Sequence, residues 1–126
     1  MDLARNVGAK PILMTQVRLV DSANTSAQRE RIDYHHVGLT HEVLVETFDK
    51  LDEIVRNVAV EKDAVLIDAS AYLSGKAWAF YDHVHLDLGG KGSEALAQFI
   101  AEALQDVFSQ ELRNKGSTKT QKSRFH

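Results

Sequence analysis

The chain has 126 residues, of which 44% are hydrophobic and 26% are charged, and its formal net charge is −3. This composition is typical of one globular domain or part of one, and the charge balance gives no reason to expect nucleic acid as a partner. Cysteine is absent, which excludes disulfides, thiolate nucleophiles and cysteine-ligated metals. No apolar run approaches the ~18 residues that a membrane-spanning helix needs, and the sequence indicates no localisation.

The first predicted elements are a short helix and a strand. Leu3 to Val7 precede Gly8, a residue that often ends a helix, and the apolar run 11–14 predicts a strand buried on both faces. A helix this short is marginal by itself. We therefore expect it to be the end of a longer helix and the chain to be the later portion of a larger domain, although a short helix held by tertiary packing fits the pattern equally well.

A polar, irregular segment follows, and then a long helix. Residues 21–40 predict a loop that is either functional or mobile, and Thr40 is suited to cap the helix after it. The helix is predicted by an apolar stripe of helical period, with Asp52 among the charged residues on its solvent side. The stripe consists of Leu44, Phe48, Leu51, Val55 and Val58.

The second half repeats the alternation of strand and helix. The run 63–68 predicts a buried strand, and glycines at 89, 90 and 92 predict a turn into a last helix whose apolar face runs from Leu96 to Phe108. Residues 113–126 are basic and predict a disordered tail. Strands alternating with helices indicate an α/β fold with parallel pairing. Two strands make a poor sheet, so its open edges also predict self-association.

The residues that suggest chemistry lie in the segment 81–90. Asp82 and His85 are three residues apart, so across a turn the carboxylate can bind one imidazole nitrogen and leave the other free as a base. A rival interpretation uses His83 and His85, which would point the same way in an extended segment and could hold a metal, with Asp82 or Asp87 completing the ligand shell. The sequence identifies no fixed third ligand for such a metal.

The segment Phe80–Leu86, with Gly90 five residues after His85 and Ala95 ten after it, resembles the last conserved block of the SGNH (GDSL-type) hydrolases. That block contains Asp-x-x-His, a glycine that opens the final helix, and a small residue one turn later. Residues 8–16 are similar to the penultimate strand of the family, which is entered from a helix ending in glycine. Residues 48–67 resemble its helix-to-strand unit, with Phe-Asp where the family often has Tyr-Asn.

The resemblance implies that residues 1–112 are the C-terminal portion of a three-layer α/β/α, flavodoxin-like parallel-sheet domain. It also implies an ester hydrolase of the Ser-His-Asp type in which Asp82 and His85 are catalytic, with no cofactor and no metal. The implied substrate is a small-molecule, carbohydrate or lipid ester, bound once the missing half of the domain completes the site.

The chain departs from the family in three blocks. The Gly-Asp-Ser-Leu block that holds the nucleophile is absent, as are the isolated glycine and the Gly-x-Asn-Asp block of the oxyanion hole. No serine of the chain has a nucleophile context, and Ser70, after the second strand, is better explained as a cap of backbone groups than as part of the site. We therefore expect negligible activity from the chain alone. A non-catalytic interaction module and a His-x-His metal-binding domain remain as alternatives.

Overall fold

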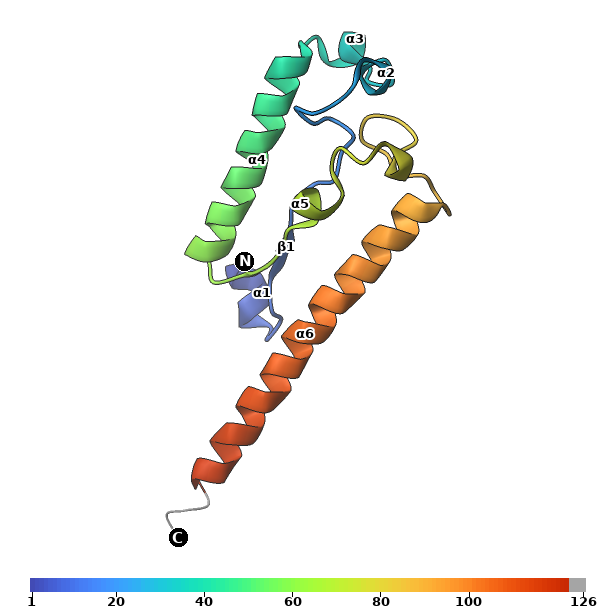
Figure 1. Ribbon diagram of the computed structural model, residues 1–126. Helices are drawn as coiled ribbons and strands as arrows, with labels where there is room; N and C mark the ends of the chain where they lie inside the picture. The colour runs from blue at the N-terminus through green and yellow to red at the C-terminus, as the bar shows by residue number, and fades with distance from the viewer. Residues whose placement is uncertain (123–126) are drawn as a thin grey trace.

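The computed structural model describes residues 1–122. Two long helices flank a small sheet of two strands (Figure 1). The elements in chain order are α1 (Asp2–Asn6), β1 (Ile12–Met14), α2 (Ser26–Arg29), α3 (Tyr34–Val37), α4 (His41–Glu61), β2 (Val65–Ile67), α5 (Ala69–Leu73), the 3₁₀ helix η1 (Ala77–Ala79) and α6 (Lys91–Lys122).

The two strands pair in parallel, with Ile12 opposite Val65 and Met14 opposite Ile67. The connection between them is α4, which packs against both strands, while α6 packs against β2, α5 and η1. Parallel strands need such a crossover, because the end of the first strand and the start of the second lie at opposite ends of the sheet. The structure is therefore of the α/β class that the sequence predicts, at the level of helices combined with a small parallel sheet.

The prediction that β1 is buried on both faces is wrong. Ile12 is 39% exposed and Met14 is 46% exposed. Helix α4 lies against β1, whereas the main packing contacts of α6 within the described residues are with β2, α5 and η1. An apolar run thus marks the strand correctly but overstates its burial, because burial depends on what packs against each face.

Helix α4 begins where the sequence predicts. The side chain of Thr40 accepts a hydrogen bond from the Val43 backbone N–H, so it caps the helix. Leu44 is buried, but Leu51, which belongs to the same predicted stripe, is 49% exposed. Asp52 was assigned to the solvent side and is only 4% exposed. That assignment is wrong, because Asp52 faces the carboxyl ends of the strands, where it forms an ion pair with Arg18.

The segment 21–40 is more ordered than a loop. It contains α2 and α3, and the Thr25 and Gln28 side chains each bind the other's backbone N–H in a capping box at the start of α2. Ile32 is buried in the core. The Tyr34 hydroxyl lies 2.9 Å from Nδ1 of His41, which is itself buried at the start of α4. These contacts fix the segment on the body of the molecule.

The hydrophobic core lies beyond the carboxyl ends of the strands rather than on the sheet alone. It combines the segment after β1, the helix α5 after β2, and the segment around η1, and the apolar side of α6 packs against it. Its buried members are Val17, Leu19, Val20, Ile32, Leu44, Ile67, Ala69, Leu73, Ala79 and Phe80. The core therefore supports the loop that follows Phe80.

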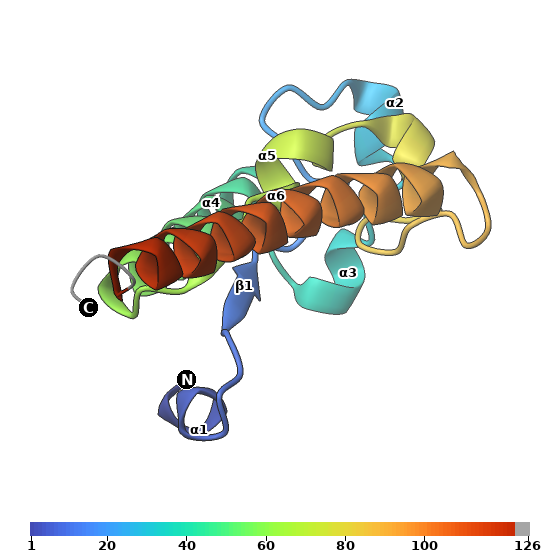
Figure 2. The ribbon, with the colours of Figure 1, turned by 90° about the horizontal axis from the view of Figure 1, so that it is seen from below.

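The two ends of the described chain are helical. Helix α1 stands apart from the long helices in Figure 2, and the Arg5 guanidinium connects it to the carbonyls of Lys62 and Asp63 at the end of α4. Helix α6 continues to Lys122. Residues 113–122 of the tail that the sequence predicts continue this helix. Residues 123–126 of that tail lie outside the described residues.

Candidate functional site

The loop that carries Asp82 and His85 is closed by backbone hydrogen bonds. Phe80 and Leu86 form an antiparallel bridge, and the Tyr81 N–H donates to the His85 carbonyl at 2.8 Å. The Asp87 N–H donates to the Ala79 carbonyl at 3.1 Å. The loop is thus a short turn whose two ends are joined by backbone hydrogen bonds, and it begins directly after the buried residue Phe80.

The structure brings together the two residues that the sequence singled out. Oδ2 of Asp82 lies 2.8 Å from Nδ1 of His85, and Oδ1 accepts hydrogen bonds from the Val84 and His85 backbone N–H groups at 2.9 and 2.8 Å. The pKa of Asp82 is held well below its ordinary value. The largest cause is the hydrogen bond from the His85 backbone N–H, followed by that from the Val84 N–H and by the His85 side chain. Asp82 is therefore a carboxylate at neutral pH, and it fixes Nδ1 of His85 as the protonated nitrogen.

The other imidazole nitrogen points away from the carboxylate. The His85 side chain is 75% exposed, against 34% for Asp82, and no hydrogen bond of Nε2 is found within residues 1–122. The pair lies in a shallow pocket of about 450 Å³, lined by Tyr81, Asp82, His85, Leu86, Asp87 and Leu88. Chemically, this is an oriented imidazole whose free nitrogen can accept and return a proton at the surface.

Glycine is required where α6 starts below this loop. A Cβ on Gly92 would lie 2.0 Å from the Ala79 carbonyl oxygen, so only glycine allows the first turn of α6 to approach the backbone of η1. Gly89 has a φ of +74°, in the left-handed region that glycine adopts without strain. The glycines predicted to mark this turn thus set the distance between the loop and the helix that supports it.

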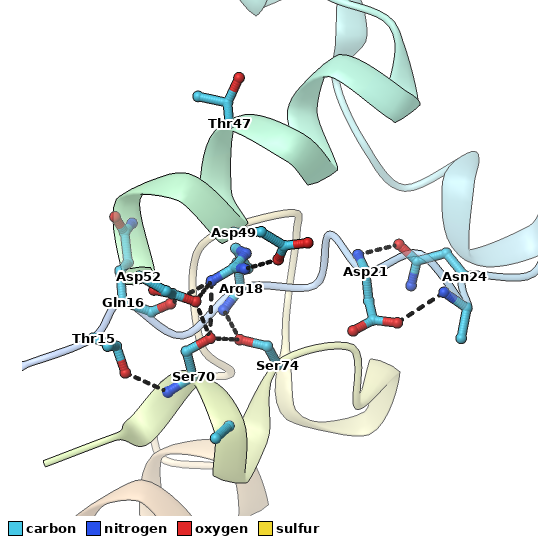
Figure 3. A network of polar contacts seen from close by, with 12 residues as sticks. Thr15, Gln16, Arg18, Asp21, Asn24, Thr47, Asp49, Asp52, Ser70 and Ser74 are labelled. Carbon is cyan, nitrogen blue, oxygen red and sulfur yellow. Dashed lines mark hydrogen bonds and ion pairs between the residues drawn. The ribbon is translucent and has the colours of Figure 1, made fainter. Parts of the chain in front are cut away.

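A second polar cluster, which the sequence did not predict, lies at the carboxyl ends of the two strands (Figure 3). Arg18, 4% exposed, donates from Nη1 to Asp52 at 2.7 Å and to the Ser70 hydroxyl at 2.9 Å. Its Nη2 donates to Asp49 at 3.0 Å, and its guanidinium lies 4.8 Å from the ring centroid of Phe48. The Nε atom of Arg18 is buried, with no hydrogen-bond partner in the part of the chain that the structure describes.

Ser70 belongs to this cluster and not to the exposed pocket. Its hydroxyl donates to Oδ2 of Asp52 at 2.5 Å, and its backbone N–H donates to the Thr15 hydroxyl at 2.9 Å. Thr15 in turn donates to Asp68 at 2.9 Å, and the Arg56 guanidinium beside Asp68 lowers the pKa of that carboxyl. Ser70 is thus engaged in a buried network of side chains and does not cap backbone groups as the sequence predicts, since the side chain of Asp68 caps α5. The network gives its hydroxyl a structural role rather than that of a free nucleophile.

One signal in the sequence could have revealed this cluster. Asp52 has the same helical phase as the apolar stripe, four residues after Phe48 and three before Val55, so it faces inward with them. Polar residues also follow both strands, at the edge where parallel strands direct their carboxyl ends together. An inward-facing acid opposite such an edge requires a cation, and Arg18 supplies it.

The three aromatic residues near the loop differ in burial. Phe80 packs in the core and is 3% exposed, but Trp78 is 53% exposed and Tyr81 is 80% exposed. Tyr81 leaves the core because the loop turns outward directly after Phe80. Tyr81 and the 92% exposed Leu88 instead form an apolar rim on the pocket that contains His85.

The metal-binding alternative finds no ligand set in the part of the chain that the structure describes. Among residues 1–122, no group of three or more histidine, aspartate or glutamate side chains is arranged to hold a metal ion. The His83 carbonyl accepts a hydrogen bond from the Leu19 N–H at 2.9 Å, which ties the loop to the core. His83 therefore contributes to the site through its backbone.

Comparisons with known proteins leave the chain without an assigned relative. No family model matches it, and no significant match was found among curated proteins or solved structures. Within residues 1–122, no helix combines the length and apolar character needed to cross a membrane.

Proposed function

We propose that the chain supplies the Asp-His pair of a serine ester hydrolase of the SGNH type, as the C-terminal portion of its three-layer α/β/α domain. The observation that carries this proposal is the Asp82–His85 hydrogen bond of 2.8 Å, which leaves Nε2 of an exposed imidazole free beside a pocket. The parallel β1–α4–β2 unit, with α6 on the other side of the strands, supports the fold part of the proposal (Figure 1).

The proposed mechanism needs a serine from outside the chain. The serine hydroxyl attacks the ester carbonyl while Nε2 of His85 takes its proton; the imidazolium then protonates the departing alcohol. Water, deprotonated by the same nitrogen, next attacks the acyl-serine; the imidazolium then returns the proton to the serine oxygen as the acyl–oxygen bond breaks and the acid leaves. Asp82, held as a carboxylate, orients the ring and stabilises its cation. The acyl or alcohol part of a small-molecule, carbohydrate or lipid ester would lie along the rim of Tyr81 and Leu88.

The experiment begins with the coding sequence upstream of Met1. A segment that encodes Gly-Asp-Ser and Gly-x-Asn-Asp would be joined to the chain, and hydrolysis of a short activated ester would be measured for the joined and the separate proteins. We expect no hydrolysis above buffer by the chain alone and clear hydrolysis by the joined protein. An upstream region without these blocks, or a joined protein that folds but is inactive, would contradict the proposal.

Variants of the joined protein separate the proposed pair from the metal alternative. Asp82→Asn should lower kcat by roughly four orders of magnitude, because the amide no longer enforces the required tautomer, and His85→Ala should do at least as much. His83→Ala is the matched control two residues away and should retain activity. Activity that depends on His83 and is lost on chelation would instead favour a metal site.

A second candidate function, self-association through the sheet edge, is favoured by the free edge of β1. The Val65 N–H donates to Pro11 and the Thr15 N–H donates to Ile67, so the backbone groups of Ile12 and Met14 face away from β2. Their side chains are also exposed. Light scattering tests this candidate: Met14→Lys should dissociate an edge-paired oligomer, whereas Leu88→Lys, at a more exposed apolar residue outside the sheet, should not. A monomeric wild-type chain would rule this candidate out.

A further inference from the structure

Arg31 reaches from the segment between α2 and α3 to the loop that carries the Asp-His pair. Its Nη1 donates to the Ala77 carbonyl at 2.9 Å, and its Nη2 donates to the carbonyls of Phe80 and, at 3.4 Å, Tyr81. These carbonyls belong to η1 and to the two residues directly before Asp82. One side chain thus holds the entry to the loop over a sequence separation of about fifty residues.

Arg31 is itself firmly positioned. Its backbone N–H donates to the Gln28 carbonyl at 3.1 Å, at the end of the helix that the Thr25 capping box starts. The next residue, Ile32, is 5% exposed and belongs to the core. The backbone of Arg31 is therefore anchored on both sides. Because this backbone is held in place, the hydrogen bonds of the guanidinium can restrict the movement of the loop.

The arginine complements a backbone contact on the other side of the loop. The buried Leu19 donates its N–H to the His83 carbonyl at 2.9 Å. The backbone is therefore hydrogen-bonded on both sides of Asp82, at Tyr81 by Arg31 and at His83 by Leu19. Hydrogen bonds from a charged, forked guanidinium are stronger and more directional than those between neutral groups. The printed hydrogen bonds of Arg31 reach neither the Asp82 carboxylate nor the His85 ring, so any effect on the pair must pass through the loop backbone.

We propose that Arg31 is a positioning residue that holds the 80–85 backbone in the conformation in which Asp82 and His85 meet. Without it, Tyr81 and Asp82 would sample other backbone conformations, and the carboxylate would lose its two N–H donors as well as the imidazole. The catalytic meaning of this role rests on the proposed function, but the conformational role does not, and it can be measured in the chain itself.

The test is NMR spectroscopy of the 126-residue chain and of three variants. Arg31→Met removes the charged fork, Arg31→Lys keeps the charge with a single-point donor, and Arg29→Met removes the neighbouring guanidinium, whose hydrogen bonds go to Asn24 and Glu42 and not to the loop. The readouts are the exchange rates of the Val84 and His85 amides and the ¹⁵N shifts of the His85 ring, which report its tautomer. Circular dichroism checks that each variant is folded.

In Arg31→Met we expect both amides to exchange about tenfold faster or more, and the His85 ring to lose its preference for the Nδ1-protonated form. Arg31→Lys should give a smaller change of the same sign and secures the test if the methionine variant folds poorly. Arg29→Met should match the wild type. Unchanged ring shifts and amide exchange in the folded Arg31 variants would overturn the proposal, as would equal changes in Arg29→Met. Failure of the esterase proposal would appear only in the hydrolysis assay and would leave these readouts unchanged.

Discussion

Replacement of Asp52 by asparagine tests the buried cluster most directly. Oδ2 of Asp52 accepts from Arg18 at 2.7 Å and from Ser70 at 2.5 Å, and both charged residues are 4% exposed. In Asp52→Asn the Arg18 cation stays buried, with Nε already unpartnered, and its remaining counter-ion is Asp49, whose side chain is 68% exposed. Breaking a buried pair from one side costs about 3–5 kcal/mol, a large part of the 5–15 kcal/mol that stabilises a typical domain.

The matched control uses the same guanidinium. Asp49→Asn removes the exposed partner of Arg18, for which screening by water limits the loss to about 1 kcal/mol or less. The free energy of unfolding is measured by urea denaturation followed by circular dichroism. If Asp52→Asn and Asp49→Asn differ by less than about 1 kcal/mol, the reasoning from burial is refuted.

A double variant separates the charge from the packing. In Arg18→Met with Asp52→Leu, both charges are replaced by apolar groups, so no buried ion is left alone. Such replacements are often neutral or stabilising, and we expect the double variant to be more stable than Asp52→Asn. A double variant as unstable as the single one would mean that the fold depends on the hydrogen bonds of Ser70 with this pair rather than on charge balance.

Three further predictions concern local features. Folding lowers the pKa of Asp82, so this carboxylate should stabilise the loop fully above its ordinary pKa of about 3.9, and the stabilisation should be lost as the pH falls below that value. The protonation of Asp82 is followed by ¹³C NMR. A carboxyl that is half-protonated at or above pH 3.9 would contradict the prediction. Gly92→Val should lower the free energy of unfolding by about 1–3 kcal/mol or more, because the new Cβ would meet the Ala79 carbonyl. The control Ala97→Val, on the exposed side of α6, should lower it by roughly 0.5 kcal/mol. Equal urea midpoints for the two variants would refute the close approach. Thr40→Ala should lower stability by about 1 kcal/mol through loss of the α4 cap, and a Thr40→Ser variant that loses as much would argue against a hydroxyl cap.

The candidate pair could be predicted from sequence because its geometry is local. Asp82 and His85 are three residues apart, and the carboxylate binds the backbone of the same turn. The start of α4 was equally predictable, since Thr40 caps a helix whose first turn follows it directly. In both cases one short segment contains all the interacting groups, so neighbouring sequence is enough to specify the contact.

The Arg18 cluster and the Arg31 contacts could not be predicted in this way. Arg18 and Asp52 are 34 residues apart, and Arg31 and Phe80 are 49 apart. The helical phase of Asp52 indicates that it faces inward, but nothing local in the sequence pairs it with Arg18, and Arg31 has the pattern of a solvated charge. Only the alignment of β1 with β2, and the placement of the segment 21–40 over η1, brings these charges to their partners.

The sequence by itself determined the helical and strand periodicity, the cap of α4 and the turn that joins Asp82 to His85, because these follow from interactions between near neighbours. The tertiary structure alone decided which apolar residues are covered, leaving Met14 and Leu51 exposed, and which cation is buried opposite Asp52, as for Arg18. The physical reason is that burial is a property of packed segments. Whether a side chain leaves water depends on distant residues whose approach no local pattern encodes.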